Sequence, residues 1–182
     1  MTELEILFDV TEKLGRAGID YMLTGSMAMN YYAVPRMTRD IDIVIELNSG
    51  DVNRVVNIFD EDYYISDIGV REAIKYESAF NIIHNTEILK IDFIIKKNTE
   101  FRQTEFKRKK KVKIDGFEIY ITSLEDLIIS KLHWAKNSDS SMQITDVDNL
   151  LTGEYDKEYL EYWLRKLHIN FEFQIMNLEL LT

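Results

Sequence analysis

The chain has 182 residues, of which 46% are hydrophobic and 30% charged, with seven glycines, one proline and no cysteine. This composition excludes collagen-like, disordered and disulfide-framework classes, and the absence of cysteine excludes a thiolate nucleophile and Cys-ligated zinc. The formal net charge of −10 excludes nucleic-acid binding by bulk attraction, because such a partner would need a local basic patch.

Helices and strands alternate in the predicted first part of the chain. Apolar residues at helical spacing and runs of β-branched residues distinguish the two. In chain order we predict a helix at 4–14, a strand at 21–23, a helix at 27–33, a strand at 40–45, a helix at 49–59, a strand at 63–65, a helix at 70–76 and strands at 79–84 and 88–95. Thr24 or Ser26 is placed to cap the second helix.

The later part of the chain changes in character. Residues 112–121 predict a β-hairpin with an Asp115-Gly116 turn. Residues 123–126 (SLED) resemble a capping box that opens a helix to about residue 135. A loop at 137–141 follows, and helices are expected over most of the remainder to residue 181. We therefore predict an α+β fold, with a mixed β-sheet core at 1–121 flanked by helices and a helical region at 122–182 packed on it.

The sequence contains no apolar run of the roughly 18 residues that span a membrane. Residues 1–18 carry acids within their apolar pattern and lack a basic leading region, which is unlike a signal peptide. We expect a soluble intracellular protein without membrane partners, assigned to the cytoplasm by default.

Acidic residues inside apolar strands are the first indication of chemistry. Asp40 and Asp42 alternate with apolar residues and so share one strand face, and Asp92 lies within the apolar strand at 88–95. Burying ionised carboxylates together is costly, and a divalent metal such as Mg²⁺ compensates while leaving positions for water and phosphate. The alternative is that Asp40 and Asp92 lie at strand ends and face water.

A second indication is the Gly25-Ser26 turn between a short strand and a helix. Glycine permits close approach of a phosphate, and a helix N-terminus offers free N–H groups and the positive end of the helix dipole. Taken alone, the turn is more typical of an ordinary Ser-capped helix than of a phosphate site.

Together these features resemble the nucleotidyltransferase superfamily of DNA polymerase β-like fold. The resemblance is carried by residues 23–26 (LTGS), a spacer of thirteen residues, residues 40–43 (DIDI) and the later Asp92. Residues 36–39 (RMTR) are similar to the small prokaryotic members. Residues 123–132, with Asp146-Val147 and Leu150-Leu151, are similar to the minimal AbiEii-type nucleotidyltransferases, many of them toxins of toxin–antitoxin pairs. The similarity covers roughly residues 20–151.

The resemblance implies a role for each matching residue. Gly25 and Ser26 would hold the triphosphate of an incoming nucleotide. Asp40, Asp42 and Asp92 would bind Mg²⁺ or Mn²⁺, and Asp92 would also help to deprotonate the acceptor. Lys131 would neutralise phosphate charge, and Asp146 matches a further acid of these toxins. Two departures are Thr24 in place of a first glycine and Gln143 where relatives often carry an acid or base.

Several cations keep two interpretations. Arg36 and Arg39 either contact phosphate or balance the neighbouring carboxylates. Lys131 either binds phosphate or extends its stem along apolar helix neighbours. The basic run at 107–111 either guides an RNA or triphosphate, or is a solvated segment that protects an edge strand, which we favour.

The predicted function is metal-dependent transfer of a nucleoside monophosphate from an NTP to an acceptor, which is RNA (such as tRNA), a protein or a small molecule. One alternative is an inactive nucleotide- or protein-binding module of the same fold. Another is an interaction protein of a toxin–antitoxin pair, whose acidity engages a basic cognate antitoxin; this is compatible with the enzyme.

Overall fold

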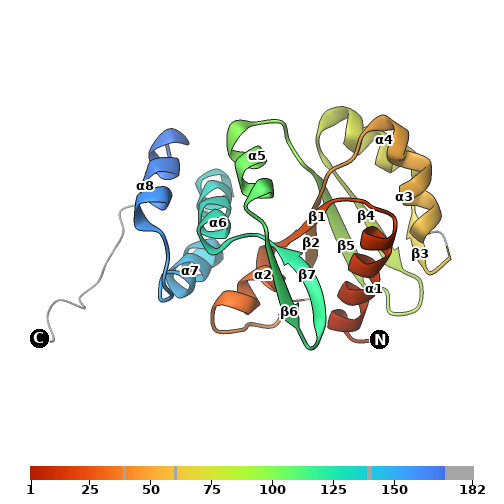
Figure 1. Cartoon of the computed structure of the whole chain (residues 1–182), viewed down its shortest axis with the longest axis horizontal. Helices are drawn as coiled ribbons and strands as arrows, with labels where there is room; N and C mark the ends of the chain where they lie inside the picture. Colours follow the sequence, from red (N-terminus) through yellow and green to blue (C-terminus); the bar gives the residue numbers. More distant parts are fainter. Residues whose placement is uncertain (39, 60, 139–140, 171–182) are drawn as a thin grey trace, which may run out of the picture.

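The computed structural model describes residues 1–38, 40–59, 61–138 and 141–170 (Figure 1). The strands are β1 Tyr21–Thr24, β2 Ile41–Ile45, β3 Tyr63–Ile65, β4 Ala79–His84, β5 Lys90–Ile95, β6 Lys110–Ile114 and β7 Phe117–Ile121. The helices are α1 Glu3–Arg16, α2 Gly25–Tyr32, the 3₁₀ turn η1 Ser49–Asp51, α3 Val52–Phe59, α4 Asp67–Tyr76, α5 Glu100–Lys107, α6 Leu124–Ser138, α7 Ser141–Leu150 and α8 Lys157–Lys166. The predicted helices beyond residue 170 lie outside the described residues.

The seven strands form one mixed sheet in the order β3-β4-β5-β2-β1-β7-β6. β2 runs parallel to β5 and β1 runs parallel to β7, whereas every other neighbouring pair is antiparallel. This confirms the predicted α+β class with a mixed sheet. The strand that carries Asp42 therefore lies in the middle of the sheet.

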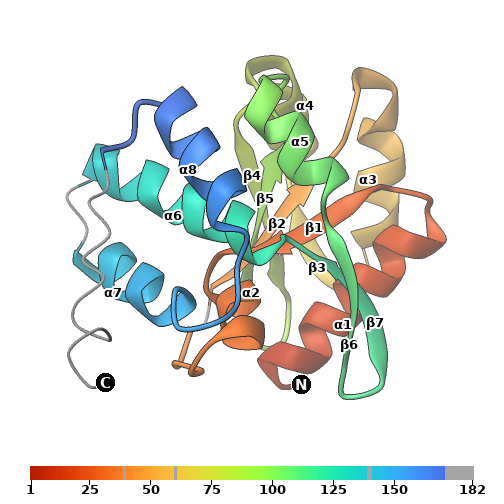
Figure 2. The same cartoon turned by 60° about the vertical axis from the view of Figure 1, so that its left-hand side comes forward.

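The two faces of the sheet are covered differently. Ile41, Ile43 and Ile45 point into the main core, which also contains the buried apolar residues of α1, α3 and α4. Met22 and Val44 point to the opposite face, where Phe106 of α5 packs on them in a smaller cluster. Because side chains alternate along a strand, Asp42 shares this second face. Figure 2 shows α6, α7 and α8 gathered to one side of the sheet, next to α2.

One local prediction was wrong, and one helix was not predicted. Thr24 occupies the N-cap of α2, but its side chain makes no capping hydrogen bond, and the hydroxyl of Ser26 instead accepts one from Arg36. The segment at 99–107 was not predicted as a helix, yet Thr99 caps α5 by accepting the N–H of Arg102. The helix buries few apolar residues, so its periodicity is weak in the sequence.

The basic run at 107–111 ends α5 and opens the edge strand β6. Three of its cations pair with acids of this chain: Arg108 with Glu125 and Asp126, Lys109 with Asp20, and Lys111 with Glu118. These ion pairs, and the position of the lysines on an edge strand, favour the interpretation as edge protection over nucleic-acid binding.

In the described part of the chain, no helix combines the length and apolar character that a membrane crossing requires.

Candidate active site

The Gly25-Ser26 turn lies against Asp42. The register of β1 and β2 places Thr24 opposite Asp42, and Gly25 follows directly with a φ of +64°. A Cβ atom added to Gly25 would lie 2.1 Å from Oδ2 of Asp42. The carboxylate therefore occupies the space that glycine leaves free, which joins two motifs that are far apart in the sequence.

Asp42 and Asp92 are direct neighbours across the parallel pair β2 and β5. Adjacent strands lie about 4.8 Å apart, and paired residues of parallel strands point to the same face. Burial raises the pKa of Asp42 to about 6, and the charges of Asp92 and Asp40 act in the same direction, while Lys131 and Lys90 oppose them. The prediction that Asp42 and Asp92 come together on one sheet face is confirmed.

Asp40 is arranged differently from Asp42. It precedes β2 and is exposed, and its backbone N–H donates to the hydroxyl of Thr38 at 3.3 Å. For Asp40 the structure therefore supports the alternative that it faces water at a strand end, because the strand begins only at Ile41, whereas Asp42 and Asp92 are half-buried within their strands. Asp40 still lies near enough to contribute to the raised pKa of Asp42.

Lys90 is a site residue that the sequence did not indicate. Its Nζ lies 2.6 Å from Oδ2 of Asp92, and both side chains stand on β5 two residues apart. Within the described ranges, no three His, Asp or Glu side chains are arranged to hold a metal ion together. Lys90 thus provides the positive charge beside Asp92. The spacing Lys-x-Asp in a strand, which puts both on one face, is the signal that could have found it.

Arg36 links the turn to the C-terminal helices. Its Nη2 donates to Ser26 Oγ at 2.6 Å, while Nε and Nη2 donate to the two carboxylate oxygens of Asp146 at 2.9 and 3.0 Å. The side chain of Asn30 fixes the backbone of Arg36 through two hydrogen bonds of 2.9 and 3.0 Å. Arg36 is therefore held rigidly beside the Gly-Ser turn.

Asp146 connects two cations in the interior. It is 1% exposed and accepts a hydrogen bond from Nζ of Lys131 at 2.7 Å in addition to those from Arg36. Burial acts to raise the pKa of Asp146, but the hydrogen bonds and charges of Arg36 and Lys131 outweigh it and lower the pKa. Lys131, which is 5% exposed, also contacts Oε1 of Gln143 at 3.1 Å. Lys131 is therefore a buried, paired cation and not a surface residue.

The sequence-based site is thus largely assembled by the fold. Gly25 and Asp42 meet directly, with Asp92 beside Asp42. Arg36, Asp146 and Lys131 form a network that reaches Ser26. Arg39 lies outside the described residues. Gln143 and Asn30 were not predicted as site residues. In the structure Gln143 contacts Lys131, and Asn30 hydrogen-bonds the backbone of Arg36, so each helps to position one cation of the network.

A mixed sheet with carboxylates on adjacent central strands, facing a Gly-Ser turn that opens a helix, defines the nucleotidyltransferase fold. Residues 3–174 match the family model described as "Nucleotidyltransferase of unknown function (DUF6036)", and the chain belongs to this nucleotidyltransferase family. The prediction of a nucleotidyltransferase enzyme is confirmed. No curated protein sequence matches the chain.

Solved structures share the fold at low sequence identity. An antigenic nucleotidyltransferase-like protein from Paracoccidioides brasiliensis is 18% identical with a TM-score of 0.59, covering 91% of this chain and 87% of its own. ANT(2")-Ia in complex with adenylyl-2"-tobramycin is 12% identical with a TM-score of 0.64, covering 92% and 99%. The lincosamide antibiotic adenylyltransferase LnuA, bound to lincomycin, is 14% identical with a TM-score of 0.54, covering 81% and 94%.

Proposed function

We propose that this protein transfers a nucleoside monophosphate from an NTP to an acceptor hydroxyl or phosphate, with divalent metal held by Asp42 and Asp92 and assisted by Asp40. The observation that carries the proposal is the contact of Gly25 with the carboxylate of Asp42. It joins a phosphate-binding turn to an acidic pair, and the reaction needs both groups within one site. ATP is the first triphosphate to test, because two proteins of similar fold handle adenylyl groups.

The N-terminus of α2 suits a triphosphate. Thr24 leaves the first-turn N–H groups of α2 without a side-chain cap, so they are available to an anion, and the helix dipole is positive at this end. Ser26 adds a hydroxyl, and Arg36 and Lys131 add positive charge close to it. Asp146 would act as a positioning residue that keeps both cations oriented toward the phosphates.

The carboxylates fit a divalent cation by their chemistry. Asp42 is an acid with a raised pKa beside a second carboxylate, and carboxylate oxygens are the ligands that Mg²⁺ prefers. A bound ion would supply charge neutralisation at the α-phosphate and the leaving pyrophosphate. Asp92, released from Lys90, would accept the proton of the acceptor hydroxyl. We place the reaction in the cytoplasm, where triphosphates are available.

The direct test incubates purified protein and Mg²⁺ with each of the four α-labelled NTPs and with total RNA, cell lysate or a panel of small hydroxyl compounds. Label transferred to one acceptor class in the presence of Mg²⁺, and its loss with EDTA, is the expected result. Triphosphate binding that depends on Mg²⁺ but never leads to transfer would favour the inactive module of the same fold. The AbiEii-like toxin role, with a cognate antitoxin, is tested separately by growth arrest on expression.

Gly25→Ala is expected to abolish transfer and to weaken triphosphate binding at least tenfold. The new methyl group would collide with Asp42, and a φ of +64° costs an alanine about 1 kcal/mol more than glycine. Gly18→Ala is the matched control, since Gly18 has a φ of +63° with open space around it. Equal loss of NTP binding in the two variants, measured by titration calorimetry, would mean that backbone strain alone accounts for the effect.

Lys90→Gln is expected to tighten metal binding about two- to fivefold. Lys90 neutralises Asp92 and so competes with a metal ion for the same oxygen, and a partly exposed charge pair is worth up to about 1 kcal/mol. Titration with Mn²⁺ followed by electron paramagnetic resonance measures the change. Lys75→Gln, on the exposed surface of α4, serves as the control for net charge. Unchanged or weaker Mn²⁺ affinity in Lys90→Gln would remove Asp92 from the metal site.

A further inference from the structure

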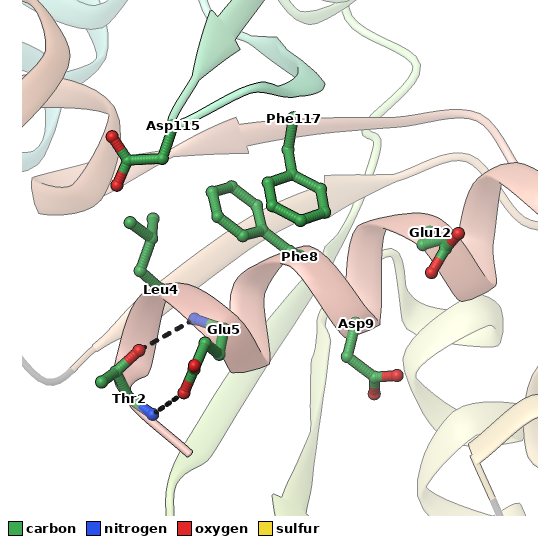
Figure 3. Close-up of a pocket in the computed structure, with 8 residues that line it drawn as sticks. All are labelled: Thr2, Leu4, Glu5, Phe8, Asp9, Glu12, Asp115 and Phe117. Carbon is green, nitrogen blue, oxygen red and sulfur yellow. Dashed lines mark hydrogen bonds between the residues drawn. The ribbon is translucent and has the colours of Figure 1, made fainter.

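A groove runs between the first three turns of α1 and the β6–β7 hairpin (Figure 3). It has a volume of about 500 Å³ and is open to solvent. We call it the α1–hairpin groove and define it by Glu5, Phe8, Asp9, Glu12, Asp115 and Phe117. It is not part of the proposed active site: α1 packs on the sheet face of Ile43 and Ile45, and Asp42 is on the opposite face.

The floor of the groove is aromatic. The rings of Phe8 and Phe117 stack with centroids 4.1 Å apart and an interplanar angle of 17°. Phe8 is buried, but Phe117 is 53% exposed at the start of β7. An exposed ring backed by a second ring presents a flat face that suits an aliphatic stem or a cation.

The rim of the groove is acidic, and only some of its carboxylates form an ion pair with a cation of this chain. Asp9 is paired with Lys13 at 2.8 Å and Glu12 with Arg16 at 2.7 Å. The carboxylate of Glu5 forms no ion pair within the described ranges: it accepts the N–H of Thr2 at 2.7 Å and lies near enough to the N-terminal ammonium to be influenced by its charge.

Asp115 has neither a hydrogen bond nor an ion pair with any residue in the described ranges. It lies in the tight turn of the hairpin, with a φ of 46°. Figure 3 shows Asp115 and Glu5 on either side of Leu4 at one end of the groove. This end therefore carries two carboxylates without an ion pair in the described ranges, and of these Asp115 has no cation of the described chain beside it while Glu5 is influenced by the N-terminal ammonium.

We infer that the α1–hairpin groove docks a basic segment of another protein, with a Lys or Arg side chain lying over Phe117 and its charged end between Glu5 and Asp115. We choose a basic occupant because its positive charge would complement the acidic rim of the groove. A second copy of this chain is disfavoured because two molecules of net charge −10 repel each other. The groove extends along about 15 Å of α1, which matches a short peptide segment better than a single small cation.

The test measures binding of a short fluorescein-labelled peptide of alternating lysine and leucine by fluorescence anisotropy at low salt. The double variant Glu5→Gln/Asp115→Asn is expected to raise the Kd about tenfold. Gln still accepts the N–H of Thr2, and Asn tolerates the left-handed turn, so the fold is retained. Phe117→Ala is expected to raise the Kd for the peptide at least fivefold. The double variant Glu5→Gln/Asp115→Asn is expected to leave nucleotidyl transfer unchanged.

The control is Glu61→Gln/Glu72→Gln, which removes two exposed acids elsewhere. An equal rise of the Kd in this control would show attraction to the whole acidic surface and overturn the inference. Full displacement of the peptide by spermine, at matched ionic strength, would assign the groove to a small polycation instead. Sedimentation of the chain without peptide tests whether a second copy occupies the groove. A dimer of the wild type that is lost in Glu5→Gln/Asp115→Asn would assign the groove to a second copy.

Discussion

Asp42→Asn is expected to reduce nucleotidyl transfer by about 10³-fold or more while leaving the fold intact. Asp42 is the acid that touches the Gly25 turn and faces Asp92, so its charge lies closest to where the proposed metal and phosphates meet. Loss of one preorganised electrostatic contact of this kind costs about 10²–10³ in rate, and loss of a metal ligand costs more. The measurement is single-turnover transfer from α-labelled NTP.

The same substitution is expected to stabilise the metal-free protein at neutral pH. Burial and the charges of Asp92 and Asp40 raise the pKa of Asp42 from 3.8 to about 6, so the folded protein binds a proton more tightly than the unfolded chain does. Stability therefore falls as pH rises from about 4 to about 6 and stays low above that range. Because one pKa unit corresponds to about 1.4 kcal/mol, ionised Asp42 weakens the fold by up to about 3 kcal/mol.

Thermal unfolding across this pH range measures the change in stability separately from the loss of nucleotidyl transfer. The wild-type protein and Asp42→Asn should unfold at the same temperature near pH 4, and the variant should be more stable at neutral pH. Mg²⁺ should raise the Tm of the wild type alone. Glu158→Gln, an exposed acid of α8, is the control. Mg²⁺-dependent transfer retained by Asp42→Asn would refute the site.

Asp146→Ala is expected to lower the free energy of unfolding by about 3–5 kcal/mol. The substitution leaves Lys131, which is 5% exposed, as a buried charge without its partner, and removes two of the hydrogen bonds that hold Arg36. Breaking a buried ion pair on one side carries a penalty of this size. For a chain of this length the Tm should fall by about 10 °C.

A double-mutant cycle identifies the buried charge as the cause. Asp146→Ala/Lys131→Met removes both ions and should recover at least about half of the lost stability. It should remain inactive, since the cation that we propose to bind phosphate is gone. Asp67→Ala, which breaks the exposed pair with Arg71, should cost less than about 1 kcal/mol. If the double variant is no more stable than Asp146→Ala in calorimetry, the pair is not what stabilises this region.

The local elements could be predicted because their signals lie within a few residues of one another. β2 follows from its β-branched run, and the β6–β7 hairpin follows from Asp115-Gly116, whose φ angles of 46° and 92° suit its tight turn. α5 was missed because it buries little, so that helix packing gives it no clear apolar stripe.

The acids and the turn were recognised from the sequence for two reasons. A charge inside an apolar strand is costly to bury unless a ligand or partner compensates it, and a glycine directly before a helix is unusual unless the backbone needs its freedom. That is a property of composition and spacing, and it was enough to indicate acids that bind a metal and a turn that binds phosphate. The nucleotidyltransferase with Gly25, Asp42 and Asp92 in one site followed from the resemblance of these motifs to that superfamily. Partners far apart in the chain are different, because only strand register and helix packing decide which charges meet. The tertiary structure alone thus placed Asp92 beside Asp42, and it joined Arg36 to Asp146 across 110 residues of sequence and Asp146 to Lys131.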